Sequence, residues 1–438
     1  MPASVGSALT IAESDLSGNP TLIFLLRTEV WFCMILQLVE VPMVARRLSL
    51  RLLAVLVFVI TCLAQPLSAQ RIVDLTSADG TKLKASYFAA AQPGPGVLLL
   101  HQCNVRGRKN WDGLAQQLAA AGINVLTLDY RGYGESGGDP FDKLPPAQMA
   151  QIQKEKWPGD FDTAFQYLVS QPGVTPNMIG VGGASCGVDN SVQMARRHAD
   201  VRSLVLLSGV TDLKGRQFLR DSARVPVFFS VADDDEFPTI PLAMEWLYSL
   251  TSNPGKTFAH YATGGHGVNM FAAHPELSGI IVNWYVTTLI KTPGRAPTPA
   301  NPPAIPPEAH ILDQIDQPGG AAKVGQLLEE ARQHDPKATL FSEATVNFVG
   351  YQHIQSGDTK GAVEIMKLNV AAYPNSPNVY DSLSDAYLAN GQRDLSRQNA
   401  KKAIELLSSD TTYNEQVRDL IRANAEQKLK QLGETPLP

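Results

Sequence analysis

The sequence has little charge and no long run of basic residues. Of its 438 residues 18% are charged, the net charge is −5 and the pI is about 5.9. Proteins that bind nucleic acid usually carry a basic patch or stripe, so nucleic acid is not an expected partner. Hydrophobic residues make up 44% of the chain, which suffices for a sizeable core, and the length suits two or three domains.

The sequence lacks a long apolar run at Leu52–Leu63: this uncharged run is too short for a transmembrane helix. Three arginines precede this run, at positions 46, 47 and 51, and Pro66-Leu67-Ser68-Ala69 follows it. A positive start, a short apolar core and a small residue before the break are typical of a secretory signal peptide. We therefore expect an exported protein, periplasmic or secreted, with no stable membrane span after cleavage.

Met43 lies just before this pattern, whereas signal peptides begin at or near the initiator. Our hypothesis is that translation starts at Met43, that residues 1–42 are a mis-called extension and that residues 43–69 are the signal peptide. The alternative is an uncleaved anchor, because Leu67 is a poor residue three positions before the proposed cut.

Short apolar runs alternate with helical patterns between residues 70 and 291, which predicts a parallel α/β sheet. Asp79-Gly80, between the first two runs, is a hairpin signal. The predicted strands are 72–75, 83–88, 97–100, 125–128, 179–182, 204–207, 227–231 and 257–261, and the predicted helices are 111–120, 161–169, 188–197, 240–250 and 275–290.

A proline-rich linker is predicted from residue 292 to 307, where seven of sixteen residues are proline. This composition favours extended, semi-rigid polyproline II over a packed core. The remaining region, 308–438, has only helical patterns, so the chain divides into a sheet-forming domain, a linker and a helical domain.

The helical domain contains an internal repeat. Gly357 and Gly391 lie 391 − 357 = 34 residues apart, and the same offset pairs small residues where two helices would cross. This period resembles the tetratricopeptide repeat (TPR), for which residues 321–333 and 413–432 would add flanking or capping helices. The alternative is an unrelated helical bundle.

A possible nucleophile lies in Gly183-Ala184-Ser185-Cys186-Gly187. A buried strand is predicted directly before this segment and an amphipathic helix directly after it. Strand, Gly-x-Ser-x-Gly and helix in this order are the context of a nucleophile elbow, in which the serine stands at the N-terminus of the helix. Ser185 is therefore the candidate nucleophile.

A nucleophilic serine needs a base within hydrogen-bond reach and an acid that orients the base. His266 follows the last predicted strand in a glycine-rich loop, with His260 and His274 as nearby competitors. Acids follow the strand 227–231, where Asp233, Asp234 and Asp235 all remain candidates. In this fold the serine comes first along the chain, the acid follows it and the histidine comes last.

The oxyanion hole is expected to use two backbone N–H groups. One belongs to Cys186, directly after the nucleophile, and the other comes from the loop after an early strand. That loop is His101-Gln102-Cys103-Asn104, in which Cys103 is the candidate donor. The run from Asp129 to Ser136 is expected to shape the loop beside the site.

With these motifs the chain resembles the α/β-hydrolase superfamily, most nearly its dienelactone-hydrolase-like branch. The resemblance covers about half of the chain and is carried by the His101 loop, Asp129-Tyr130-Arg131-Gly132, Gly183–Gly187, the acid after the Pro226 strand, and Gly265-His266. It implies a mostly parallel sheet flanked by helices, a Ser-His-Asp triad and, from the position of the acid before a proline, Asp235 as the third member.

Two departures from that family concern the site. Dienelactone hydrolases carry cysteine as the elbow nucleophile, whereas this chain has Ser185 there and Cys186 one residue later. Gln102 replaces the glycine that usually follows the loop histidine, which would narrow the acyl pocket or alter the oxyanion loop.

The two cysteines that follow the predicted signal peptide, Cys103 and Cys186, both occupy predicted oxyanion-hole positions. Two N–H groups aimed at one oxygen have neighbouring Cα atoms, within the roughly 4.4–6.8 Å that a disulfide tolerates. An exported protein meets an oxidising compartment, so we hypothesise a Cys103–Cys186 disulfide. The alternative is a pair of buried thiols that pack as small hydrophobes.

The sequence thus predicts an exported serine hydrolase that cleaves a small ester or a related acyl bond, with no cofactor and no metal. A protein partner is expected to bind the TPR-like domain. The alternatives are an inactive hydrolase-fold scaffold or interaction protein, and an enzyme of the same fold that acts on a peptide or a carbon–carbon bond.

Overall fold

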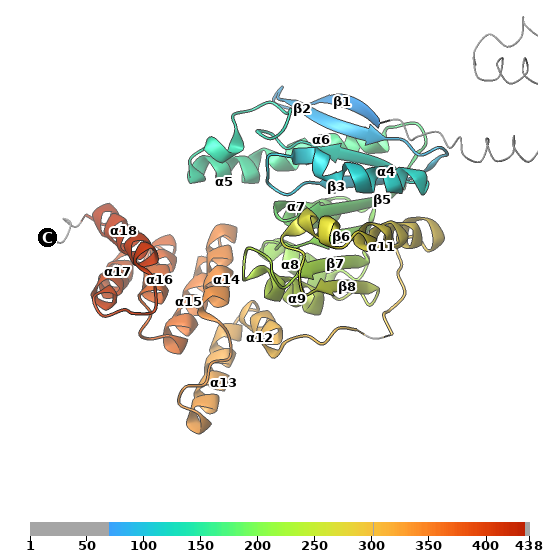
Figure 1. Ribbon diagram of the computed structural model, residues 1–438. Coiled ribbons are helices and arrows are strands. Elements are labelled where there is room, and N and C mark those ends of the chain that lie inside the picture. Colours follow the sequence, from blue (N-terminus) through green and yellow to red (C-terminus); the bar gives the residue numbers. More distant parts are fainter. Residues whose placement is uncertain (1–69, 301, 434–438) are drawn as a thin grey trace, which may run out of the picture. The chain divides into compact units, whose positions relative to one another are not determined.

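The computed structural model describes residues 70–300 and 302–433 (Figure 1). The hypotheses on the N-terminal extension (1–42) and the signal peptide (43–69) concern residues outside these ranges. Within the described ranges, none of the helices combines the length and the hydropathy that crossing a membrane requires.

Eight strands form one sheet in the order β1-β2-β4-β3-β5-β6-β7-β8. The β1–β2 and β2–β4 pairs are antiparallel, and the other neighbouring pairs are parallel. With helices on both faces this is the α/β-hydrolase fold, so the predicted fold class is confirmed. The strands are β1 Gln70–Thr76, β2 Lys82–Phe88, β3 Gly94–Leu100, β4 Asn124–Leu128, β5 Val174–Ala184, β6 Val201–Leu207, β7 Val227–Ala232 and β8 Lys256–Tyr261.

The central strands are apolar on both faces, which is why they lie inside a parallel sheet covered by helices. In β3, residues 97–100 are fully buried, and their Cα partners lie in β4 on one side and β5 on the other. Parallel strands bring their carboxyl ends to one edge of the sheet. The loops after β3, β5, β7 and β8, which carry the predicted site residues, therefore share that edge.

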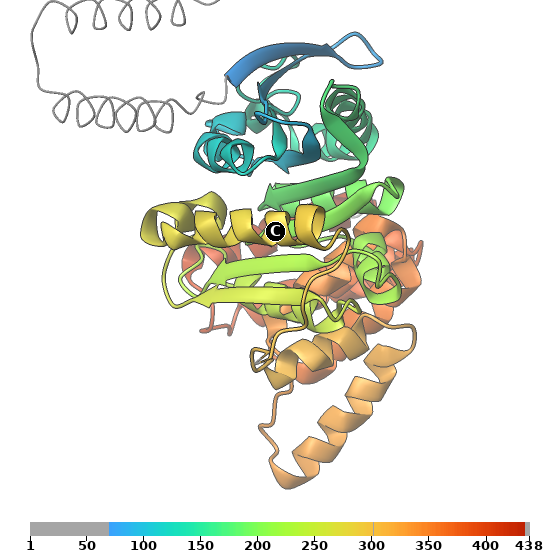
Figure 2. The same ribbon diagram turned by 90° about the vertical axis from the view of Figure 1, so that its right-hand side faces the viewer.

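Helices cover both faces of the sheet. α4 and α11 share one apolar cluster with the strands, and α6, α7 and α9 share the other. Figure 2, turned by 90°, shows α11 in yellow running along the sheet. The helices of this sheet region are α4 Asp112–Ala120, α5 Pro146–Glu155, α6 Trp157–Val169, α7 Cys186–Arg197, α8 Leu213–Asp221, α9 Ile240–Leu250, α10 Met270–Ala273 and α11 Glu276–Tyr285.

Three of these helices, α5, α8 and the short α10, were not predicted from the sequence. α5 has no buried side chain, so no apolar face marks it. The buried side chains of α8 include an arginine, Arg216, whose burial depends on a partner far away in the sequence. The helix predicted over 275–290 consists of α11 and a π-helical turn, Val286–Lys291.

From Pro307 to Gln431 the described elements are all helices, as predicted for this region. Two helix pairs repeat with a constant offset: α16 begins 377 − 343 = 34 residues after α14, and α17 begins 393 − 359 = 34 residues after α15. Within the first pair, a Cβ on Gly350 would press against the Met366 side chain. The helices are α12 Pro307–Ile315, α13 Gly320–His334, α14 Glu343–Ser356, α15 Thr359–Ala372, α16 Pro377–Ala389, α17 Arg393–Leu407 and α18 Glu415–Gln431.

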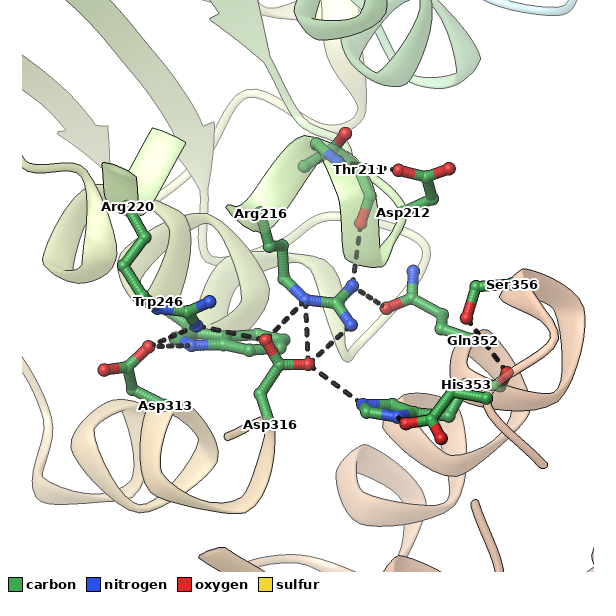
Figure 3. Close-up of polar contacts among 12 residues, drawn as sticks. Thr211, Asp212, Arg216, Arg220, Trp246, Asp313, Asp316, Gln352, His353 and Ser356 are labelled. Carbon is green, nitrogen blue, oxygen red and sulfur yellow. Dashed lines mark hydrogen bonds and ion pairs between the residues drawn. The ribbon is translucent and has the colours of Figure 1, made fainter. Parts of the chain in front are cut away.

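The helical region packs against the sheet region, with α12 on α9 and α14 on α8. A buried ion pair lies in this contact (Figure 3). The guanidinium of Arg216 donates from Nη2 to Asp316 Oδ1 over 2.6 Å, and from Nε to both carboxylate oxygens over 3.0 and 3.1 Å. It also donates to the Thr211 carbonyl and to Gln352, and it lies 4.8 Å from the ring of Trp246.

His353 of α14 extends this network. Its Nε2 lies 3.1 Å from Asp316 Oδ1, and its Nδ1 lies 2.8 Å from Asp358 Oδ2. Burial alone would raise the pKa of Asp316, but the hydrogen bond to His353 and the charge of Arg216 hold that pKa well below its usual range. Asp316 is therefore a carboxylate whose charge is neutralised across the contact between the two regions.

Candidate active site

Ser185 lies at the sharp turn between β5 and α7. Its backbone angles are φ 55° and ψ −122°, a region that non-glycine residues rarely adopt. The turn leaves no room for side chains on its glycines: a Cβ on Gly183 would overlap the Gly187 carbonyl oxygen, and one on Gly187 would overlap that of Leu100. The pentapeptide thus has the strand–turn–helix geometry of a nucleophile elbow.

The turn presents Ser185 at the N-terminus of α7. Its backbone N–H donates to the Leu207 carbonyl over 2.9 Å, which fixes the turn to β6, and the side chain remains half-buried. The unpaired N–H groups and the dipole of a twelve-residue helix favour negative charge at this end. A serine oxygen that acquires negative charge during a reaction would be stabilised here.

His266 and Asp235 form a buried pair. Nδ1 of His266 lies 2.8 and 2.9 Å from the two carboxylate oxygens of Asp235, and each residue is only 6% exposed. Nε2 of His266 is buried and has no hydrogen-bond partner among the described residues. A Cβ built on Gly267 would lie 3.5 Å from the Ala184 Cβ, so the loop of His266 packs against the residue before Ser185.

The other candidates for the acid and for the base have partners of their own. Asp233 lies 2.6 Å from Nε2 of His260, and Asp234 accepts from the Gly265 N–H over 2.8 Å. His274 contacts the Thr263 carbonyl and Glu276. Among the three neighbouring aspartates the structure brings Asp235 alone to His266. In the described part of the chain, no group of three or more His, Cys, Asp and Glu side chains is arranged to hold a metal ion.

The two residues named as oxyanion donors, Cys103 and Cys186, form a disulfide with their Cα atoms 6.0 Å apart. The bond joins the loop after β3 to the first residue of α7. A first helical residue has an N–H without an intrahelical acceptor. The Cys103 N–H donates no hydrogen bond to any other described residue. Both amides are therefore available to an external oxygen.

His101 fixes the start of the loop after β3, which is the proposed oxyanion loop. Its Nε2 accepts from the Tyr130 N–H over 3.1 Å, so Nδ1 carries the proton and donates to the Gln102 carbonyl, 2.6 Å away. Burial lowers the pKa of His101 to about 4, which keeps the ring neutral near neutral pH. A neutral ring is what these two contacts require, because only a neutral imidazole has an acceptor nitrogen.

The Asp129 run shapes the neighbouring loop, in the role expected from the sequence. Asp129 forms a buried ion pair with Arg108 and also accepts from the backbone N–H groups of Arg108, at 2.7 Å, and Glu135, at 2.9 Å. A Cβ on Gly134 would overlap this carboxylate. Both oxygens of the buried Asp129 carboxylate are therefore engaged within this loop region.

The segment around α5 lies over an aromatic cluster next to His101. Phe141 and Trp157 are each 2% exposed and their ring centroids are 5.0 Å apart, so they are packing residues and do not line an entrance. Tyr130 stacks on His101, with 3.8 Å between centroids, and contacts Trp157. Met149 of α5 is partly buried and packs against the same core cluster.

Phe237 is a site residue that the sequence reasoning missed. Its ring centroid lies 4.9 Å from that of His266, and the residue is 52% exposed. Its N–H donates to Asp235 Oδ1 over 2.9 Å. Its only signal in the sequence was its place two residues after the acid, and an exposed ring beside the His266 imidazole offers an apolar surface to a bound molecule.

Residues 83–276 match the model of the dienelactone hydrolase family. A thiohydrolase of Aspergillus aculeatus is 29% identical over 133 residues, which cover 30% of this chain and 39% of that protein. An uncharacterised protein of Mycobacterium tuberculosis is 32% identical over 148 residues, which cover 34% of this chain and 48% of that protein. The matches thus span less than half the length of these two curated relatives.

Among solved structures, an esterase of Pyrococcus furiosus is similar at a TM-score of 0.41 and 17% sequence identity, covering 50% of this chain and 93% of that one. The family match includes Ser185, Asp235 and His266 and stops before the helical region. It supports a hydrolase, carried by the sheet region of this chain.

Proposed function

We propose that the sheet region is a serine hydrolase that cleaves an ester or a related acyl bond. The observation that carries the proposal is the state of His266, whose Nδ1 is held by Asp235 while its buried Nε2 has no partner in the described part of the chain. A general base needs one nitrogen fixed and the other free for the proton that it accepts. In a site without substrate the bond from this nitrogen to the nucleophile is often long, and it tightens when substrate binds.

In the proposed reaction Ser185 Oγ attacks the acyl carbon while His266 Nε2 takes the hydroxyl proton. Asp235 holds the imidazole in the tautomer with a proton on Nδ1 and stabilises the imidazolium. The Cys103 and Cys186 N–H groups bind the oxyanion of the tetrahedral intermediate. His266 then gives its proton to the leaving alcohol or thiol, which leaves an acyl-serine.

Water resolves the acyl-serine in the second half of the reaction. His266 Nε2 takes a proton from the attacking water, the same two amides bind the second oxyanion, and the proton returns to Ser185 Oγ as the carboxylic acid leaves. The thiohydrolase relative supports thioesters as well as oxygen esters. The exposed ring of Phe237 beside His266 favours an apolar group on the substrate.

The test is hydrolysis of p-nitrophenyl esters of graded acyl length, and of matching thioesters, by the protein without its first 69 residues. We expect turnover by the wild-type protein and its loss in Ser185→Ala. Ser170→Ala, an exposed serine at the end of α6, is the matched control and should keep full activity. A folded wild-type protein that turns over none of these substrates would favour the scaffold alternative, and one that cleaves only peptides would favour the peptidase.

Export and partner binding by the TPR-like helices remain proposals. The Cys103–Cys186 disulfide supports export, because such bonds persist mainly in oxidising compartments. The 34-residue spacing of the two helix pairs supports a repeat module that binds a protein. N-terminal sequencing of the protein from its native host would show whether the mature chain begins near residue 70.

A further inference from the structure

Gln102 bridges the two loops that carry the proposed chemistry. Its side chain is buried, with the residue 7% exposed, and Oε1 accepts from the Val268 N–H over 3.0 Å. Val268 comes two residues after His266, and Cys103 comes directly after Gln102. The side chain therefore ties the loop of the proposed base to the loop of a proposed oxyanion donor.

The packing around this contact is close. Gly267 has a φ of 60°, and a Cβ on it would overlap Oε1 of Gln102. We call residues 265–268, which include His266, the base loop. Gly267 of the base loop and Gln102 of the oxyanion loop are therefore complementary in shape. Glycine at position 102, which is usual in the family that the chain resembles, would leave this space empty and the Val268 N–H unpaired.

The base loop is held at three points. Asp234 accepts from the Gly265 N–H, Asp235 accepts from His266 Nδ1, and Gln102 accepts from the Val268 N–H. The first two acceptors follow β7, and the Asp234 bond is exposed to water. Gln102 is buried like Asp235, and of the three acceptors it is the one that comes from the oxyanion loop.

Gln102 is itself immobilised through its main chain. Its carbonyl oxygen accepts from His101 Nδ1, at 2.6 Å, and from the Asn104 N–H, at 2.7 Å. In a trans peptide the N–H of the next residue points opposite to this carbonyl. The two contacts therefore fix the direction of the Cys103 N–H as well as the origin of the Gln102 side chain.

We propose that Gln102 is a positioning residue that acts through the Val268 N–H to keep His266 Nε2 and the Cys103 amide in one fixed arrangement around Ser185. The inference rests on the proposed function, because it assigns Gln102 a task in that site. Preorganised donors and bases lower a barrier without reorganisation during the reaction, so a loosened base loop slows turnover more than it weakens binding.

The test compares Gln102→Met, which keeps the length of the side chain and removes the acceptor, with Gln102→Asn, whose amide is too short to reach Val268. Gln116→Met, on the exposed face of α4, is the matched control. On a p-nitrophenyl ester we expect kcat to fall roughly 10- to 100-fold in both Gln102 variants, with KM nearly unchanged. The control should match the wild-type protein.

Hydrogen exchange provides a readout that does not depend on activity. The Val268 amide should exchange faster in both Gln102 variants, while amides of the central strands keep their wild-type protection. Gln102→Asn carries the test if Gln102→Met does not fold. Wild-type kcat in the folded variants, or an unchanged Val268 exchange rate, would overturn the proposal. If the wild-type protein hydrolyses nothing, the proposed function fails by itself, and the exchange rates still show whether Gln102 holds the loop.

Discussion

This molecule has two buried contacts between a histidine and an aspartate, and they differ in which nitrogens of the histidine ring have partners. In the candidate site His266 donates from Nδ1 to Asp235, and its buried Nε2 has no partner within residues 70–300 and 302–433. At the contact between the sheet and helical regions, His353 has a carboxylate at each ring nitrogen, Asp316 at Nε2 and Asp358 at Nδ1. A ring with a free nitrogen can exchange a proton with a substrate, whereas a ring with both nitrogens occupied can only hold its neighbours together.

The carboxylates differ in the same way. Asp235 accepts from His266 and from the Phe237 N–H, and no lysine or arginine of the described residues pairs with it. Asp316 is bonded to Arg216, Arg220 and His353, so it is the centre of a charge network. The comparison teaches that burial of a His–Asp pair alone does not identify a catalytic pair. The two pairs differ in the second ring nitrogen, which in His266 has no partner among the described residues.

Substitution of the two histidines should separate their roles most strongly. In His266→Ala we expect kcat/KM on a p-nitrophenyl ester to fall roughly 10³- to 10⁴-fold, because the general base is lost. His353→Ala should keep near-wild-type kcat/KM while it lowers the free energy of unfolding. Steady-state kinetics with a urea titration of each variant measures both effects. A folded His353→Ala protein as inactive as His266→Ala would break the comparison.

The two aspartates should show the reverse order in stability. Asp316→Asn leaves the buried guanidinium of Arg216 without its counter-charge, and we expect the free energy of unfolding to fall by about 3–5 kcal/mol. Asp235→Asn removes no partner of a buried cation and should cost much less, although its activity should be lost. Urea unfolding at neutral pH measures the difference. Equal losses of unfolding free energy in the two variants would show that the Arg216–Asp316 pair stabilises the fold no more than the His266–Asp235 pair does.

Removal of the disulfide should affect the site and spare the contact between regions. The bond closes a separation of 83 residues, and we expect Cys103→Ala/Cys186→Ala to lose about 2–4 kcal/mol of unfolding free energy. Because the bond ties the residue of a proposed oxyanion donor to the turn at Ser185, kcat should fall as well. Hydrogen exchange at residues of α12 and α14 should stay at wild-type rates. Wild-type kcat in the double variant would show that the bond does not position the oxyanion hole.

Acid should weaken the site region through a third histidine, His101. Its pKa is lowered by burial from 6.5 to about 4 in the folded protein. Above pH 6.5 neither state is protonated and the group contributes nothing to pH dependence. As pH falls from 6.5 towards 4 the unfolded chain binds a proton that the folded protein does not, so stability declines.

At pH 5 this decline amounts to about 2 kcal/mol, since one pKa unit corresponds to about 1.4 kcal/mol. The measurement is the change in urea midpoint between pH 7 and pH 5 for the wild-type protein and for His101→Asn. The variant should be less stable at pH 7 but lose less on acidification. An equal loss in both proteins would mean that His101 does not titrate in this window.

The sequence predicted the eight strands and the elbow because these features are local. Apolar runs such as 97–100 and the Gly-x-Ser-x-Gly motif depend on neighbours along the chain. The choice among Asp233, Asp234 and Asp235 could not be made this way, because adjacent aspartates have the same local pattern and differ only in the direction of their side chains. Their separate partners, His260, the Gly265 N–H and His266, are known only from the fold.

The contacts between distant segments were also beyond local reasoning. Arg216 and Asp316 are 100 residues apart, and without this partner the polar segment of α8 has no reason to be buried. Gln102 and Val268 are 166 residues apart. From the sequence alone Gln102 was interpreted as a departure from a family pattern, and its role as a hydrogen-bond acceptor could not be predicted. The signal peptide and the start at Met43 lie outside the described residues and stay predictions.

The most direct test of the central claim is the intact mass of the protein after incubation with a fluorophosphonate, which modifies an activated serine. The account predicts one adduct per chain, located by peptide mapping to the segment that contains Ser185, absent from Ser185→Ala and formed far more slowly in His266→Ala. A folded, disulfide-bonded wild-type protein that stays unmodified, or an adduct of equal yield in Ser185→Ala, would contradict it.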